Sequence, residues 1–201
     1  TKDFTKGNIP GQLILFTLPF MASNAFQVFY STVDMIIVGK YVGTPGLSAV
    51  SQSSLIVNFA TMVCLGFSNA GQVLIAQALG AGRKKELNPI IGTLFTMLAC
   101  LSIFFTLVVV FGKDIIAGIM DIPTESYEMS LQYMAICGGG LFFTAGYNMI
   151  SAVLRGMGDS KRPFWFILIA SVINLLLDLL FTGLFQWGVA GAAWATISSQ
   201  A

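Results

Sequence analysis

The sequence contains no histidine, and charged residues make up only 9% of its 201 residues. The absence of histidine excludes Ser-His-Asp and Cys-His catalysis and metal sites built on imidazole. Ordinary soluble domains carry about 25% charged residues, so this chain has too few charges to cover a surface that faces water. The net charge is +1 and the cations form no binding stripe, so no nucleic-acid partner is indicated.

Cysteine is also scarce. Cys64, Cys100 and Cys137 each lie inside an apolar run, and their spacing matches no metal motif. Free cysteine commonly packs as a small apolar residue, so we predict three buried thiols.

Apolar residues, in contrast, make up 56% of the chain. They form six segments, at about residues 11–38, 47–79, 90–111, 127–153, 163–185 and 189–201. A helix needs about 20 residues to cross the hydrocarbon core of a bilayer, and the first five segments are long enough. The sixth stops within an apolar pattern, so we expect the natural protein to continue beyond it. The sequence therefore predicts an all-α membrane protein with six transmembrane helices.

The cations predict an orientation. If successive helices alternate in direction, eight of the ten Lys and Arg residues lie on the side of the N-terminus: Lys2, Lys6, Arg83, Lys84, Lys85, Arg155, Lys161 and Arg162. Lys40 and Lys113 lie on the other side, where the acidic residues after residue 111 are expected to form a solvated loop. The positive-inside rule then places the N-terminus in the cytoplasm.

Two acidic residues, Asp34 and Asp178, lie inside apolar segments. Charges at membrane depth are rare and usually face a protein interior or a wet cavity. Each belongs to a polar stripe with helical spacing. The stripe of the first segment contains Thr17, Asn24, Gln27, Ser31 and Asp34, and that of the fifth contains Ser171, Asn174, Asp178 and Thr182. The fourth segment adds Tyr133, Cys137, Thr144, Asn148, Ser151 and Arg155, and the sixth adds Thr196 and Ser199.

Some of these residues have a purely structural interpretation. Ser and Thr in membrane helices often bond their own backbone or join helices, and Tyr133 can anchor a helix at the membrane surface. The glycines at 138–140 predict close helix packing. Pro19 predicts a kink, or at least a weak point, in the first segment.

The two carboxylates indicate ion-coupled transport. Removal from water and a second carboxylate nearby both favour the protonated form of one member, and such a pair titrates jointly. Carboxylates together with Asn and Thr oxygens also form a hard-oxygen cage for Na⁺. The residues leave the choice between H⁺ and Na⁺ open.

The same stretches carry a family resemblance. Over residues 1–201 the chain resembles the N-terminal six-helix lobe of the multidrug and toxic compound extrusion (MATE) transporters. The matching stretches are LPFMASNAFQVFYSTVDMIIVGKYVG, GFSNAGQVLIAQALGAGRKKE, LRGMGDSKRP, and NLLLDLLF followed by GVAGAAWAT. Family members have twelve helices in two similar lobes around a cleft that opens to each side in turn, so the resemblance implies a C-terminal lobe as partner.

The resemblance also implies roles for single residues. Asp34, Asn174, Asp178 and Thr196 match a cluster implicated in binding Na⁺ or H⁺, and Tyr133 and Asn148 match positions that join this network. Pro19 matches the proline at a helix bend. Asn24, Gln27 and Ser31, on the stripe of the first segment, are expected in the same cavity network. The implied protein is no enzyme but an antiporter of the plasma membrane, which exports small organic cations and needs only Na⁺ or H⁺ as coupling ion.

Two other functions remain open, a flippase and a membrane scaffold, while an intramembrane enzyme is disfavoured because the sequence has no metal or nucleophile constellation. A flippase for lipids or lipid-linked oligosaccharides has a similar fold, but its cavity needs cations to meet pyrophosphate, and both membrane-depth charges here are acidic. A membrane scaffold predicts that neutralising Asp34 and Asp178 costs no activity. An intramembrane aspartyl protease would cleave peptides without any ion gradient.

Overall fold

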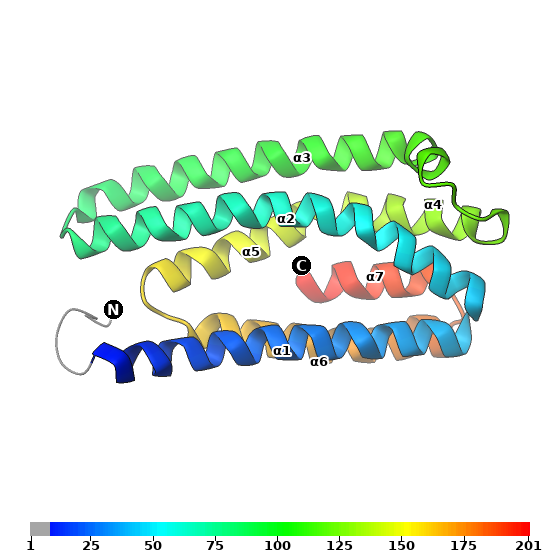
Figure 1. The fold of residues 1–201 in the computed structure, drawn as a ribbon, viewed down its shortest axis with the longest axis horizontal. Helices are drawn as coiled ribbons and strands as arrows, with labels where there is room; N and C mark the ends of the chain where they lie inside the picture. The colour runs from blue at the N-terminus through cyan, green and yellow to red at the C-terminus, as the bar shows by residue number, and fades with distance from the viewer. Residues whose placement is uncertain (1–8) are drawn as a thin grey trace.

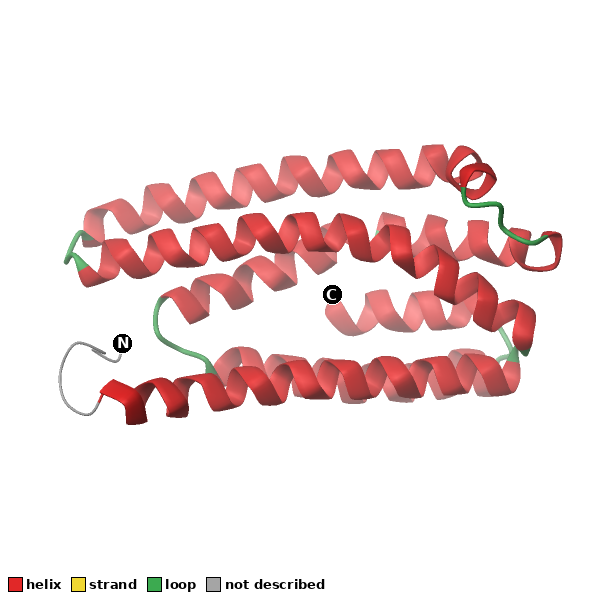
Figure 2. Cartoon of the chain, in the orientation of Figure 1, coloured by secondary structure: helices red, strands yellow, loops and turns green. Residues whose placement is uncertain are grey.

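The computed structural model describes residues 9–201, and this part of the chain forms a bundle of helices without strands (Figures 1 and 2). Lys2 and Lys6, which entered the predicted orientation, lie outside the described residues. The first three predicted segments are helices α1 (Ile9–Tyr41), α2 (Thr44–Gly80) and α3 (Leu87–Ile119), with a short 3₁₀ turn η1 (Lys84–Glu86) before α3. The later segments are α4 (Thr124–Gly139), α5 (Leu141–Gly156), α6 (Lys161–Asp178), the π-helix η2 (Leu179–Leu184) and α7 (Gly188–Gln200).

Helix α3 is longer than predicted. The apolar segment was expected to end near residue 111, with a solvated loop after it, but the helix continues to Ile119. Apolarity ends at Lys113 and Asp114, whereas nothing in the sequence breaks the helix before Pro123. The expected loop is therefore largely an extension of α3 beyond the apolar run.

The fourth segment is two helices and not one. Helices α4 and α5 meet at Gly140 with a bend of 45°. The Thr106 hydroxyl donates a hydrogen bond to the Gly138 carbonyl at 2.9 Å, beside this bend. A Cβ on Gly138 would lie 2.7 Å from Val109, and one on Gly140 would lie 2.4 Å from Ile197. The prediction of close packing at these two glycines is confirmed.

The predicted kink at Pro19 is absent. Helix α1 is continuous from Ile9 to Tyr41, and Figure 1 shows no sharp bend in it. Proline still removes one backbone donor, so the helix lacks one hydrogen bond there. Packing of α1 against α6 supports the straight form.

The helices form two groups joined by α7. Helix α2 packs against α3, α4 and α5, while α1 packs against α6. Helix α7 packs against both α6 and α4 and lies between the two groups in Figure 1. A buried apolar cluster joins the groups through Val38 of α1, Val50 of α2, Tyr133 of α4 and Ala192 of α7.

The outside of the bundle is apolar, as expected for a multi-pass membrane protein. In the described part of the chain, four helices are long and apolar enough to cross a membrane, and the bent pair α4–α5 makes five if the two helices form one span. Large side chains such as Phe111 and Ile119 are 78% and 80% exposed. Cys100 is exposed as well, so the prediction that it is buried was wrong: it lies on the apolar outer face of α3, near exposed Met97 and Phe104.

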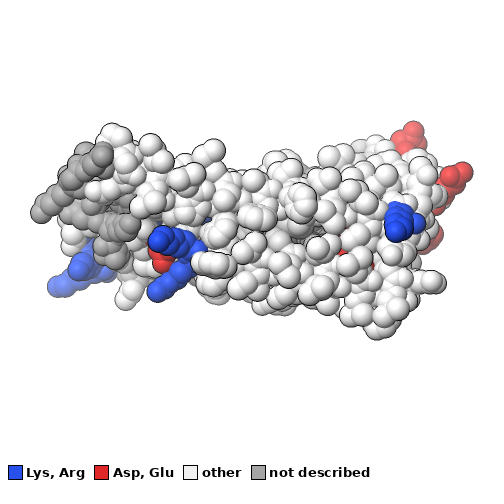
Figure 3. Space-filling view, turned by 90° about the horizontal axis from the view of Figure 1, so that it is seen from below, with Lys and Arg blue, Asp and Glu red and all other residues white. Residues whose placement is uncertain are grey.

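Charges gather at the two ends of the bundle (Figure 3). The connection between α2 and α3, the last turn of α5 and the first turn of α6 carry six cations at one end, here called the cationic end: Arg83, Lys84, Lys85, Arg155, Lys161 and Arg162. The opposite end, here called the acidic end, carries Asp114, Asp121, Glu125 and Glu128 together with Lys40 and Lys113.

Candidate functional site

The centre of the candidate site is a pair of carboxyl groups from α1 and α6. Asp178 has 0% of its surface exposed, and Asp34 is half-buried. Helices α1 and α6 lie side by side, which brings the two carboxyl groups close enough to influence each other. Asp178 is the last residue of α6, immediately before the π-helix η2.

The pair lacks the partners that normally compensate a buried carboxylate. Both oxygens of Asp178 and one oxygen of Asp34 are buried without a hydrogen-bond partner. In the described part of the chain the ion pairs are Arg83–Glu86 and Arg162–Asp159, so neither carboxylate has a basic partner. Two carboxylates in contact repel each other, so a proton or a bound cation is needed to stabilise the pair.

Asn174 and Tyr133 complete the buried part of the site. Asn174 lies one turn before Asp178 and is 2% exposed, and its amide nitrogen has no hydrogen-bond partner. Tyr133 is 6% exposed and interacts with Asp34, Asp178 and the neighbouring Cys137. The structure thus brings together three predicted residues from α1, α4 and α6, with Asn174 next to them.

Two threonines of the polar stripes differ in their surroundings. Thr196 is half-buried on α7, and its hydroxyl donates to the Ala192 carbonyl of its own helix at 3.0 Å. Thr182, one turn after Asp178, is 1% exposed and lies 3.4 Å from the Gly188 carbonyl oxygen, to which its hydroxyl donates. Both retain oxygen lone pairs that can accept a bond from water or bind a cation.

The remaining predicted residues are Asn148 of α5 and three polar residues of α1. Asn148 of α5 is half-buried, and its amide donates to the Thr144 carbonyl at 2.9 Å. Asn24, Gln27 and Ser31 are exposed on α1, so their stripe forms part of the surface of this bundle. Their membership of a shared cavity network stays a prediction.

Two tyrosines belong near this site but were not predicted. Tyr30 lies one turn before Asp34 and interacts with both carboxylates and with Gln27. Tyr147 of α5 interacts with Tyr30 and Ser151. Their spacing of four from Asp34 and from Ser151 was the available signal, but tyrosine in membrane helices is usually an interfacial anchor.

The oxygen-rich donor set suits either a small cation or a proton. Two carboxylates, an amide and threonine hydroxyls are hard oxygen ligands of the kind that small cations prefer. The same carboxyl pair can instead hold one shared proton. Among the described residues, no group of three or more His, Cys, Asp or Glu side chains is placed to hold a metal ion.

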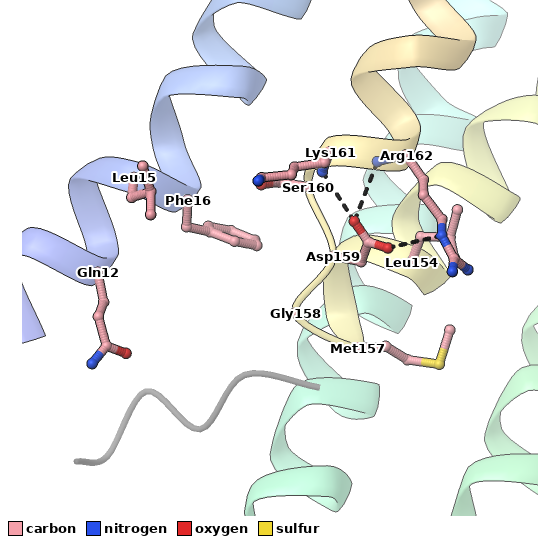
Figure 4. Close-up of a pocket in the computed structure, with 10 residues that line it drawn as sticks. All are labelled: Gln12, Leu15, Phe16, Leu154, Met157, Gly158, Asp159, Ser160, Lys161 and Arg162. Carbon is pink, nitrogen blue, oxygen red and sulfur yellow. Dashed lines mark hydrogen bonds and ion pairs between the residues drawn. The ribbon is translucent and has the colours of Figure 1, made fainter. Parts of the chain in front are cut away.

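A cavity of about 420 Å³ lies at the cationic end, away from the carboxyl pair (Figure 4). Gln12 and Phe16 of α1 line one side, and residues 157–162 line the other. The Asp159 carboxylate accepts hydrogen bonds from the backbone nitrogens of Lys161 and Arg162 at 3.0 and 3.2 Å. These bonds provide partners for two of the backbone N–H groups that have none within the first turn of α6. None of the predicted site residues lines this cavity.

Comparisons with known proteins give one consistent result. The family model MatE matches residues 19–180. The probable multidrug resistance protein YpnP of Bacillus subtilis (strain 168) is 37% identical over 198 residues, which cover 98% of this chain and 44% of that protein. The probable multidrug resistance protein YoeA of the same strain is 30% identical over 204 residues, covering 99% of this chain and 44% of that protein.

A solved structure agrees with this result. An outward-facing multidrug resistance MATE family transporter of the MOP superfamily superimposes with a TM-score of 0.87 at 25% sequence identity. The match covers 94% of this chain and 42% of that one. The chain therefore spans less than half the length of the relatives that it matches.

Proposed function

The chain belongs to the MatE family, and from this premise we propose that it forms one lobe of a secondary active multidrug antiporter. In this proposal the protein exports organic cations in exchange for Na⁺ or H⁺, and the missing partner is a second, C-terminal lobe. The observation that carries the proposal is the buried Asp34–Asp178 pair, which has no basic partner among the described residues. An unpaired carboxylate at membrane depth is costly, and its retention is explained by ion binding.

Coupling requires the ion to bind one conformation of the transporter better than the other. We assign ion binding to Asp34, Asp178, Asn174 and Thr196, with Tyr133 and Asn148 in the surrounding network. Neutralisation of the pair removes the repulsion between α1 and α6 and so changes which arrangement of α1 is stable. Pro19, where α1 lacks a backbone hydrogen bond, is the expected point of bending in the alternative state.

The drug site is assigned to the face of α1 that this bundle leaves exposed. Asn24, Gln27 and Ser31 lie there among large apolar side chains such as Phe20 and Met21. A flat organic cation needs apolar contacts and a few polar groups, and methionine adapts to different ligand shapes.

Orientation follows from the charge distribution. Six of the described cations lie at the cationic end, so we place this end in the cytoplasm and the acidic end outside the cell, in the plasma membrane. The sign of the membrane-depth charges is unfavourable for the flippase alternative, because pyrophosphate requires cations and both charges here are acidic.

The test is transport by the natural protein that contains this sequence, reconstituted in liposomes. Efflux of a fluorescent organic cation is followed under an imposed Na⁺ gradient and then under an imposed pH gradient. We expect one gradient to drive efflux and Asp178→Asn to reduce the driven rate by roughly tenfold or more.

Asp114→Asn is the matched control, since Asp114 is an exposed carboxylate at the acidic end. It is expected to transport like the unchanged protein. If neither gradient moves the dye in the unchanged protein, antiport of organic cations is wrong.

A further inference from the structure

Polar side chains continue from the carboxyl pair toward the cationic end. Tyr30 interacts with Asp34 and Asp178, and Tyr147 of α5 interacts with Tyr30. Ser151 and Arg155 follow Tyr147 at spacings of four on the same face of α5, so the three side chains lie near one another. These four residues, Tyr30, Tyr147, Ser151 and Arg155, are called the polar path below.

The polar path runs between two helices whose backbones stay apart. Within the described residues, no Cα atom of α1 lies within 8 Å of a Cα atom of α5, so long side chains bridge the space. A cavity of about 20 Å³ lies along it, lined by Gln27, Tyr30, Tyr147, Ser171 and Gln200 among others. A water molecule needs about 10–15 Å³ of such space and two to four polar partners, so the cavity has room for one.

Two hydroxyl groups of the path call for such a partner. The Tyr147 hydroxyl and the Ser151 hydroxyl are both buried without a hydrogen-bond partner, and Ser151 is 2% exposed. Buried hydroxyls without a protein partner usually bond to water. The middle of the path is therefore suited to hold a water molecule beside Tyr30 and Tyr147, and the buried Ser151 hydroxyl continues the polar groups toward the end of α5.

Arg155 closes the path at the cationic end. Its Nε donates a hydrogen bond to Oε1 of Gln72 on α2 at 3.0 Å, and its guanidinium carbon lies 5.5 Å from the centroid of the Phe20 ring on α1. The side chain thus connects α5, α2 and α1. The next residue, Gly156, lies so close to α2 that a Cβ would be 2.8 Å from the Gln72 carbonyl oxygen. This end of α5 therefore packs tightly against α2.

The charge of Arg155 has no carboxylate partner in the described chain, where the ion pairs involve Arg83 and Arg162. The titratable groups along the path are Tyr30 and Tyr147, and at its far end the carboxyl pair with Tyr133 and Cys137. A half-buried cation at the mouth of a narrow polar path repels any other cation that approaches.

We propose that Arg155 is an electrostatic gate, which prevents the coupling ion from leaking between the Asp34–Asp178 site and the cationic end. The inference rests on the proposed antiport, because only a coupled transporter needs to close its ion site toward one side. Gln72 and Phe20 hold the guanidinium across the path, and the gate opens when α1 moves away from α5.

The test measures ion leak without drug, in liposomes that contain the natural protein with this sequence. Passive Na⁺ and H⁺ fluxes are recorded for the unchanged protein, for Arg155→Met and for Arg155→Lys. We expect Arg155→Met to raise the leak of the coupling ion about tenfold. Arg155→Lys keeps the positive charge and is expected to leak no more than the unchanged protein. Adding Tyr147→Phe to Arg155→Met removes a hydroxyl from the path and is expected to reduce the leak again.

Arg162→Gln is the matched control, since Arg162 is an exposed arginine at the same end and is paired with Asp159. It is expected to leave both leak and drug efflux unchanged. If Arg155→Met exports drug with full coupling and no added leak, the gate is wrong while antiport stands. If the unchanged protein shows no gradient-driven efflux, the failure belongs to the proposed function.

Should Arg155→Met not reach the membrane, Gln72→Leu tests the same gate, because it removes the hydrogen bond that holds the guanidinium. The Gln72→Leu variant is expected to leak the coupling ion as well. A Gln72→Leu variant that leaks no more than the unchanged protein contradicts the proposal.

Discussion

Asp178 combines complete burial with a lack of partners, which distinguishes it from the exposed acids that the structure describes. Among the described residues it is 0% exposed, and neither of its carboxylate oxygens has a hydrogen-bond partner. Such a group lowers stability, because a buried charge without a partner is costly. Proteins retain such groups mainly where function requires them.

We therefore predict that Asp178→Asn is more stable than the unchanged protein, although it loses transport. Asparagine has nearly the same shape and no charge, so the repulsion from Asp34 disappears. The midpoint of thermal unfolding in detergent should rise by roughly 2–4 °C, which corresponds to about 1 kcal/mol for a chain of this size.

Asp114→Asn serves as the comparison and should shift the midpoint by less than about 1 °C, because exposed substitutions usually change stability little. A marked loss of stability in Asp178→Asn, with no loss in Asp114→Asn, would show that the carboxylate is a structural group.

Sequence reasoning at this scale identified the charged residues but not all of their neighbours. Asp34 and Asp178 are conspicuous because each interrupts an apolar run. Tyr30 and Tyr147 were missed because a tyrosine is common near membrane surfaces, and only packing shows which phenol faces a carboxylate.

At the scale of helices, the bend between α4 and α5 determines how the bundle is filled. The bend of 45° turns α5 away from the line of α4, and Gly140 lies against Ile197 of α7 at this point. A side chain at Gly140 has no room, whereas Gly139 is exposed and a Cβ there would meet nothing within 4 Å.

This difference predicts opposite effects for neighbouring glycines. Gly140→Ala should destabilise the protein by about 1–3 kcal/mol, since its methyl group displaces a β-branched side chain in a packed interior. Gly139→Ala should be neutral, or stabilising by about 0.4–1 kcal/mol, because alanine restricts the unfolded chain. Thermal unfolding of both variants checks this, and equal stabilities would contradict the assigned packing.

Helix boundaries show where local sequence is insufficient. The apolar pattern ended α3 eight residues too early, because it reports the depth of the membrane and not the length of the helix. The same pattern runs without interruption through residues 138–140, where the backbone bends.

For the whole molecule, the separation of charges predicts which end faces the cytoplasm. We expect a cysteine placed at the acidic end to react with a membrane-impermeant thiol reagent in intact cells. Glu125→Cys should be labelled from outside, and Lys85→Cys should be labelled only after permeabilisation, since both positions are exposed at opposite ends. Cys64, Cys100 and Cys137 are replaced by alanine beforehand, and the reverse labelling pattern would overturn the orientation.

The sequence alone determined the all-helical membrane fold, its apolar segments and the two carboxylates at membrane depth. These properties are local: hydropathy depends on consecutive residues, and a charge in an apolar run is visible without knowing its neighbours. Only the tertiary structure decided that Asp34 meets Asp178, that Asn24, Gln27 and Ser31 remain on the surface, and that Tyr30 and Tyr147 lead toward Arg155. Helical periodicity states which residues share a face, whereas the direction of that face depends on which helices pack together.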